Sequence, residues 1–177
     1  MRVLGIDPGT ATTGYGFLET NGDGTPYLRS YGWIETKDNG DPAKRLVEIY
    51  NGIKDLLSKH SPDVVAMERL FFFSNQRTAM RVSQAQGIFL LAAAQKNIPL
   101  FEYPPGQVKL KIAGSGRADK KLMQETIKEI FNIKAPDKKK THFDDVADAI
   151  AIALCHIRVK RETQNEKRDT QNVQRKT

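Results

Sequence analysis

The sequence predicts an α/β fold in which a five-stranded mixed sheet is flanked by helices. Strand-like segments joined by short turns occupy the first 35 residues, and helix-length and strand-length segments alternate after them. This order is typical of a sheet with helices on its faces. The length of 177 residues suits one domain with a substantial core. We therefore expect a single α/β domain.

The first three expected strands form an antiparallel meander. The run VLGID at 3–7 ends in Asp-Pro-Gly, which is typical of a strand that enters a turn. The segments TGYGFLE at 13–19 and LRSYGWIE at 28–35 have strand character, and NGDGTPY between them indicates a turn. Short turn-rich connections favour antiparallel neighbours.

Helices and strands alternate along the rest of the chain. Asp41-Pro42 opens a helix whose apolar residues recur at helical spacing, and the apolar run DVVAME at 63–68 is typical of a buried parallel strand. The remaining expected elements are a helix over about 76–96, a strand at 98–103, a Gly- and Lys-rich loop over 104–120 that could contain a short helical turn, and helices over 120–131 and about 144–159.

The composition separates a domain at 1–158 from a tail at 159–177. The tail has almost no apolar residues, so we expect it to be basic and disordered. The segment from Arg158 to the end contains seven lysines and arginines and three acids, so it carries +4 of the net charge of +7. The rest of the chain is only weakly basic, and net charge alone is a weak argument for nucleic-acid binding.

The single cysteine indicates a reducing compartment, and we expect a cytoplasmic protein. Cys155 has no partner for an internal disulfide and lies in the apolar segment AIALCH, where a packing role is expected rather than a catalytic one. No apolar run approaches the length that spans a bilayer. The N-terminal segment MRVLGIDPG is interpreted as a strand rather than a signal peptide.

Four acidic residues lie where apolar segments end or begin. Asp7 ends the first strand, Glu68 ends the fourth, and Asp145 and Asp148 lie three residues apart at the start of the last helix. Ligands collect outside the carboxyl ends of strands in such sheets, and residues three apart share a helix face. If the first and fourth strands are adjacent and the helix packs against their ends, the four carboxylates converge.

Converging carboxylates repel one another, and two Mg²⁺ ions about 4 Å apart would relieve that repulsion. Such ions would polarise a phosphodiester, activate water and stabilise a leaving 3′-oxygen, so no protein nucleophile is needed. Asp7 is expected to bridge both ions, while Glu68, Asp145 and Asp148 complete the ligand sets. Mn²⁺, which accepts the same oxygen ligands, is an alternative ion.

Each acid also has an ordinary interpretation as a turn, surface or helix-cap residue. Together these interpretations are strained, because Asp148 lies in an otherwise apolar stretch. Asp144 is the acid most readily explained as a cap alone, and whether it shares the role of Asp145 stays open. His142 is interpreted as a loop residue rather than as a participant in protonation at the site.

Basic clusters lie in the same third of the chain as two of the acids. Each alone is typical of a solvated surface, but together they favour a phosphate-binding face. The clusters are Lys109 with Lys111, Arg117 with Lys120 and Lys121, and Lys134 with Lys138, Lys139 and Lys140.

Four segments, in this order, resemble the RuvC family of bacterial Holliday junction resolvases. They are GIDPGTATTGYG at 5–16, AMERLFF at 66–72, FEYPPGQVKLKIAGSGRADK at 101–120 and DDVADAIAIA at 144–153. DPG and DxxD are weak motifs singly, but their combination at these spacings is specific. The similarity extends over about residues 1–158.

The resemblance implies an RNase H-like nuclease domain at 1–158 and a Mg²⁺-dependent endodeoxyribonuclease acting in DNA recombination and repair. It implies a homodimer that nicks a four-way junction symmetrically and leaves 5′-phosphate and 3′-hydroxyl ends. It also implies contact with a branch-migration complex of RuvA and RuvB. Asp7, Glu68, Asp145 and Asp148 match the family's four acids, the third of which is His in some members.

The resemblance also suggests which residues contact DNA. Alignment with the family points to Phe71 as an aromatic that could stack on an unpaired base, a contact worth about 1–3 kcal/mol. The small-residue helix at 76–94 is a candidate dimer interface, although ordinary packing on the sheet explains it equally well. The candidate phosphate contacts are Arg77, Arg81, Lys109, Arg117, Lys120 and Lys121.

Three other functions are compatible with parts of the pattern. The segment LGIDPGTATTGYG superficially resembles the first phosphate loop of actin-type and sugar-kinase nucleotide-binding folds, but 177 residues are too few for the two domains they need. A non-catalytic junction-binding module would gain nothing from carboxylates that face phosphate. A nuclease of the same fold acting on RNA or hybrids is separated from a junction nuclease only by the resemblance.

Overall fold

The structure, a computed structural model, describes residues 1–37, 41–69, 76–133 and 140–174. Five strands form one mixed sheet in the order β3-β2-β1-β4-β5. The antiparallel pairs β1–β2 and β2–β3 form the predicted meander, and β4 is parallel to both β1 and β5. The strands are β1 (Arg2–Asp7), β2 (Thr12–Thr20), β3 (Pro26–Glu35), β4 (Val64–Glu68) and β5 (Leu100–Tyr103).

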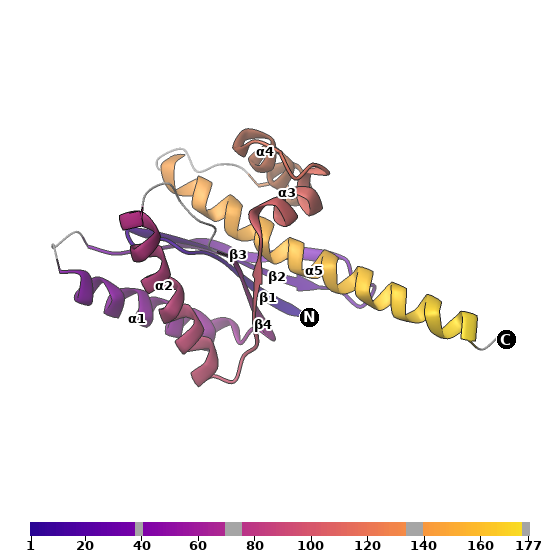
Figure 1. The fold of residues 1–177 in the computed structure, drawn as a ribbon, viewed down its shortest axis with the longest axis horizontal. Coiled ribbons are helices and arrows are strands. Elements are labelled where there is room, and N and C mark those ends of the chain that lie inside the picture. Colours follow the sequence, from indigo (N-terminus) through magenta and orange to yellow (C-terminus); the bar gives the residue numbers. More distant parts are fainter. Residues whose placement is uncertain (38–40, 70–75, 134–139, 175–177) are drawn as a thin grey trace.

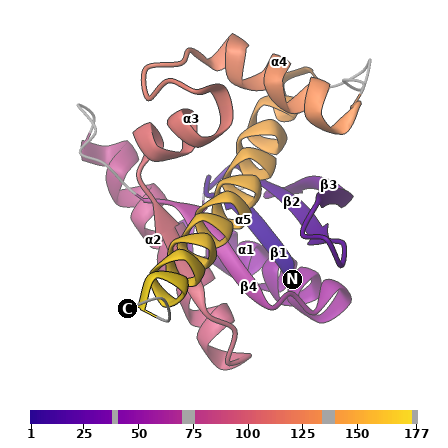
Figure 2. The same cartoon turned by 90° about the vertical axis from the view of Figure 1, so that its right-hand side faces the viewer.

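Within the described part of the chain, five helices flank the sheet in a three-layer arrangement. Two of them cover one face, while α5 crosses the other face with α3 and α4 beside it (Figures 1 and 2). The helices are α1 (Pro42–His60), α2 (Gln76–Gln95), α3 (Pro105–Ala113), α4 (Lys120–Phe131) and α5 (Lys140–Gln174), of which α1 and α2 share a face. In the described residues, no helix is both long enough and apolar enough to cross a bilayer.

Two boundaries differ from the prediction. The segment 104–120, predicted as a loop with room for only a short helical turn, contains the nine-residue helix α3, because Val108 and Ile112 lie one turn apart and pack into the core. The last helix is also longer than predicted: α5 begins at Lys140 and continues through the expected disordered segment to Gln174.

The extension of α5 projects from the body of the molecule (Figure 1). Residues 161–168 are all exposed, and the ion pair between Lys111 and Glu162, at 2.5 Å, ties its first turn to α3. A helix already nucleated in the core adds one hydrogen bond for each further residue, so it continues without apolar side chains. The division of the chain at residue 158 stays a prediction.

Alternation along the central strands creates a core on each side of the sheet. Val3 and Ala66 face α5, whereas Leu4, Ile6 and Met67 face α1 and α2. Because successive side chains of a strand point to opposite faces, the residues that follow at even spacing from Val3 and Ala66 also point toward α5. Those residues include the acids that end β1 and β4.

Two glycines allow α5 to lie directly against the sheet. A Cβ atom at Gly5 would lie 2.1 Å from the carbonyl oxygen of Ala149, and one at Gly14 would lie 2.1 Å from that of Asp145. Real Cβ atoms do not approach backbone this closely, so only glycine fits at these positions. The two glycines therefore determine how near the acids of α5 come to those of the strands.

Candidate active site

Neighbouring strands bring the first two acids together. Ile6 of β1 pairs with Met67 of β4, so Asp7 and Glu68 end adjacent parallel strands at the same edge of the sheet. Both side chains project to the face that α5 covers, by the alternation described above. The first and fourth strands are therefore adjacent, which was the condition for these two acids to converge.

Helix α5 supplies the other two acids from above the sheet. Asp145 and Asp148 lie in its second and third turns, and the backbone of Asp145 rests against Gly14 of β2. Asp7 interacts electrostatically with Asp148, Glu68 and Asp145. The four predicted acids thus converge at one edge of the sheet.

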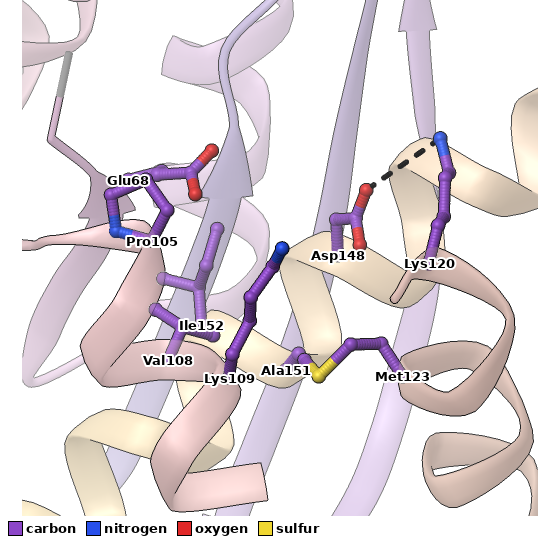
Figure 3. Close-up of a pocket in the computed structure, with 9 residues that line it drawn as sticks. All are labelled: Glu68, Pro105, Val108, Lys109, Lys120, Met123, Asp148, Ala151 and Ile152. Carbon is purple, nitrogen blue, oxygen red and sulfur yellow. Dashed lines mark ion pairs between the residues drawn. The ribbon is translucent and has the colours of Figure 1, made fainter. Parts of the chain in front are cut away.

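A cleft of about 200 Å³ opens where the acids meet α3 and α4. Glu68 and Asp148 lie on its walls, and Lys109 and Lys120 reach toward it from α3 and α4 (Figure 3). Its apolar lining consists of Pro105, Val108, Met123, Ala151 and Ile152. The cleft therefore places two cations and two acids around one space that water can enter.

The acids of the cleft resist ionisation. Burial, followed by the charges of Asp148, Glu68 and Asp145, raises the pKa of Asp7 well above its ordinary value of 3.8. Burial also raises the pKa of Glu68 from 4.5 to about 7, that of Asp148 from 3.8 to about 6, and that of Asp145 above its ordinary value. A bound cation would relieve this cost, because it supplies the charge that the acids lack.

The donor set suits a hard divalent cation. Carboxylate oxygens are the ligands that Mg²⁺ and Mn²⁺ prefer, and four of them surround this edge of the sheet. Among the described residues, however, no three Asp, Glu, His or Cys side chains are arranged to hold an ion as they stand. The assignment of Asp7, Glu68, Asp145 and Asp148 as ligands therefore requires side-chain rotation and stays a prediction.

Lys120 is a cation within reach of the helical acids. Its Nζ atom lies 3.3 Å from Asp144 Oδ2 and 3.9 Å from Asp148 Oδ2. Desolvation lowers the pKa of Lys120, but the neighbouring acids, Asp148 first, outweigh it and raise the value overall. Lys120 therefore stays charged beside the acids of α5.

Two residues of the first turns of α5 differ from their interpretation. Asp144 lies inside the helix and accepts a hydrogen bond of 2.6 Å from Gln124 Nε2 of α4, so it is not a cap. His142 is helical rather than part of a loop, and its ring stacks on Trp33 at a centroid distance of 5.2 Å. Both residues join α5 to neighbouring elements.

The predicted DNA contacts separate into two groups. Lys109 and Lys120 line the cleft, whereas Arg117 and Lys121 are exposed outside its lining, and Lys121 pairs with Glu125 of its own helix at 3.9 Å. Phe71 lies outside the described residues. Arg77 falls within the backbone of α2, but its side chain lies outside the described part.

A buried glutamine holds the end of β4 and was missed from the sequence. Gln86 of α2 is only 7% exposed and donates from Nε2 to the carbonyl oxygen of Glu68 at 2.8 Å. Its signal in the sequence is a polar residue beside Ala85 on the apolar side of an otherwise packed helix. Gln86 therefore positions the backbone from which the Glu68 carboxylate extends.

Comparison with known proteins extends the likeness over most of the chain. A family model described as crossover junction endodeoxyribonuclease RuvC matches residues 3–156. The protein of that name from Moorella thermoacetica is 43% identical over 156 residues, covering 88% of this chain and 90% of that protein. Its counterpart from Thermotoga petrophila is 44% identical over 170 residues, covering 94% of this chain and 99% of that protein.

A solved structure shares the architecture as well. T. thermophilus RuvC in complex with a Holliday junction substrate matches with a TM-score of 0.77 and 32% identity, covering 88% of this chain and 92% of that chain. The matched region includes the strand-end acids and the acids of α5. This chain belongs to the RuvC family of crossover junction endodeoxyribonucleases.

Proposed function

We propose that this protein resolves four-way DNA junctions in recombination and repair by hydrolysing one phosphodiester bond at each of two symmetric positions. The observation that supports this most directly is the convergence of Asp7 and Glu68 with the acids of α5, beside Lys109 and Lys120. Nucleases of this family depend on a divalent metal ion. The carboxyl groups whose pKa values burial raises are suitable ligands for this ion.

The residues of the cleft have separate parts in this reaction. Lys109 and Lys120 would bind the oxygens of the scissile phosphate, and Asp7, Glu68, Asp145 and Asp148 would hold two Mg²⁺ ions. The chemistry supplied by such ions is polarisation of the phosphodiester, activation of a water molecule and stabilisation of the leaving 3′-oxygen. Release of that oxygen leaves a 3′-hydroxyl and a 5′-phosphate.

A dimer formed through α2 would present two such sites to one junction. Ala85, Phe89, Ala92 and Ala93 of α2 are buried against the rest of the chain. Its outer side is unusually apolar, since Met80 is 66% exposed, Leu90 46% and Leu91 50%. A two-fold axis along this surface would relate the two active sites as the equivalent strands of a junction are related.

Partners and location follow from the same family. Contact with a RuvA and RuvB branch-migration complex would bring the nuclease to junctions. A cytoplasmic location agrees with the single buried thiol of Cys155, whose pKa burial raises to about 12. That thiol is therefore protonated and unreactive at neutral pH.

Cleavage of a synthetic four-way junction tests the proposal. With Mg²⁺, the wild-type protein is expected to make paired nicks at symmetric positions, and EDTA or Glu68→Gln is expected to abolish them while junction binding is retained. Glu129→Gln, which neutralises an exposed acid of α4, is the matched control and should cleave normally. Several junction core sequences are needed, because nicking can depend on sequence.

Two results would contradict the proposal. One is the absence of nicking by the wild-type protein across all core sequences. The other is preferential cleavage of an RNA–DNA hybrid in the same assay, which would favour the alternative substrate. Loss of junction binding in Glu68→Gln would instead show that this carboxylate serves binding rather than the chemical step.

A further inference from the structure

The edge of the sheet that carries the acids also carries the first turns of α1 and α2. Both helices begin at the end of the molecule where β1 and β4 end, because each follows a strand that finishes there or beside it (Figure 1). They lie on the face opposite α5 (Figure 2). The β1–β2 loop, which follows Asp7 and includes Thr10, lies at the same edge.

A second cleft, of about 130 Å³, is lined by Thr10 of that loop and by residues from the beginning of α1 and from α2. Arg45 enters it from the first turn of α1 and Arg81 from the second turn of α2, while Thr10 and Gln84 add polar groups. Two guanidinium groups from different helices that line one small cavity are typical of a site for phosphate oxygens.

The walls of this cleft are held in place. Thr36 donates from Oγ1 to the carbonyl oxygen of Thr10 at 2.8 Å, which fixes the loop that follows Asp7. The cleft also contains one acid, Asp41, whose carboxylate accepts from the backbone N–H groups of Ala43 and Lys44 at 2.9 and 3.3 Å. That acid therefore serves to cap α1, and the two arginines line the same cavity.

We propose that this Thr10–Arg45–Arg81 cleft binds a backbone phosphate of the same DNA strand that is cut at the acidic cleft. The inference rests on the proposed function. A strand whose scissile phosphate lies beside Asp7 can continue over the β1–β2 loop, where a nearby phosphate meets the two guanidinium groups. The cleft thus fixes the strand on one side of the cut and contributes to its orientation, because contacts with phosphates set register without reading sequence.

The salt dependence of junction binding tests this site without requiring cleavage. Binding of the wild type, Arg45→Gln, Arg81→Gln and the double variant is measured in EDTA over a range of salt concentrations. Each single variant is expected to weaken binding about tenfold but to leave the slope of log K against log salt nearly unchanged, because the remaining arginine still neutralises the phosphate. The double variant should reduce the slope by about 0.7–0.9, the value for one phosphate.

Lys54→Gln is the matched control, since Lys54 is an exposed cation of α1 outside the cleft. An equal loss of slope in this control would overturn the proposal, because the effect would then come from the overall charge. An unchanged slope in the double variant, weaker binding in only one of the single variants, or a slope loss in each single variant that adds up in the double variant would also overturn it. Far-ultraviolet circular dichroism confirms that each variant is folded.

A neutral methylphosphonate, placed at one position at a time beside the scissile phosphate, locates the contact. One position is expected to weaken wild-type binding but not further weaken Arg81→Gln, and no such position would contradict the site. Failure of the inference is distinct from failure of the proposed function. If the inference fails, the wild type nicks junctions and the arginine variants bind them as tightly as the wild type does. If the proposed function fails, the wild type itself does not nick junctions.

Discussion

Replacing Glu68 with Gln is expected to stabilise the metal-free protein at alkaline pH while it abolishes cleavage. The carboxylate of Glu68 lies in the cleft with Asp148, and burial raises its pKa from 4.5 to about 7. The folded protein therefore holds this proton more tightly than the unfolded chain does. Functional carboxylates of this kind are retained at a cost in stability.

The sign and size of the effect follow from linkage. Stability associated with the protonated carboxyl is fully present below pH 4.5 and is lost as pH rises through the folded-state pKa of about 7. At about pH 8 the ionised carboxylate then costs the fold about 3 kcal/mol, at about 1.4 kcal/mol for each pH unit between the two values. Because water enters the cleft and screens the charge, we expect a measured gain of about 1–3 kcal/mol for Glu68→Gln.

Urea unfolding of the wild type and the variant at about pH 4 and about pH 8, in EDTA, measures this difference. The variant should be more stable only at the higher pH, and Mg²⁺ should stabilise the wild type more than the variant, because a ligand stabilises the state that binds it. Glu129→Gln serves as the control. Equal stability of Glu68→Gln and the wild type at both pH values would refute the electrostatic account of the cleft.

Three further predictions concern the scaffold around the cleft. Gly14→Ala is expected to push α5 off the sheet beside Asp145, which should destabilise the fold by about 2–3 kcal/mol and slow single-turnover cleavage. The control Gly22→Ala places its Cβ atom in open space and should have neither effect, and normal cleavage by Gly14→Ala would count against the close packing. Gln86→Leu should lower the free energy of unfolding, measured by thermal denaturation, by about 1–3 kcal/mol and should lower the cleavage rate, because the Glu68 carbonyl loses its donor. An unchanged cleavage rate would show that Gln86 does not position the acid. Truncation after Val159 should preserve cleavage in a nicking assay and weaken binding mainly at low salt; inactivity at every salt concentration would contradict this.

The acids illustrate what local pattern reveals. Asp7 and Glu68 were recognisable because each ends an apolar strand, and Asp145 and Asp148 because they interrupt an apolar helix at one-turn spacing. Their convergence at one edge agrees with that reasoning. The RNase H-like fold implied by the resemblance is confirmed by the likeness to the RuvC structure of T. thermophilus.

Other features depended on contacts between distant segments. The helix α3 was not predicted from its Gly- and Lys-rich segment, because only the packing of Val108 and Ile112 against α5 distinguishes this segment from a loop. The extension of α5 was missed because its composition resembles that of a disordered tail, whereas a helix anchored in a core can continue into solvent. Lys121 follows Lys120 directly and was also predicted as a possible DNA contact, but it lies outside the lining of the cleft and pairs with Glu125.

By itself, the sequence determined the types of most elements, the order in which those elements occur and the acids at their ends, since these follow from periodicity and from residues that terminate strands. Only the tertiary structure decided how closely those acids approach one another, which lysines face them and that Arg45 and Arg81 line one cleft. Those properties depend on the direct contact of α5 with Gly5 and Gly14 and on the shared edge at which several elements end or begin. The contact of α5 with these glycines and the shared edge arise from packing between residues far apart in the chain, which local sequence patterns do not reveal.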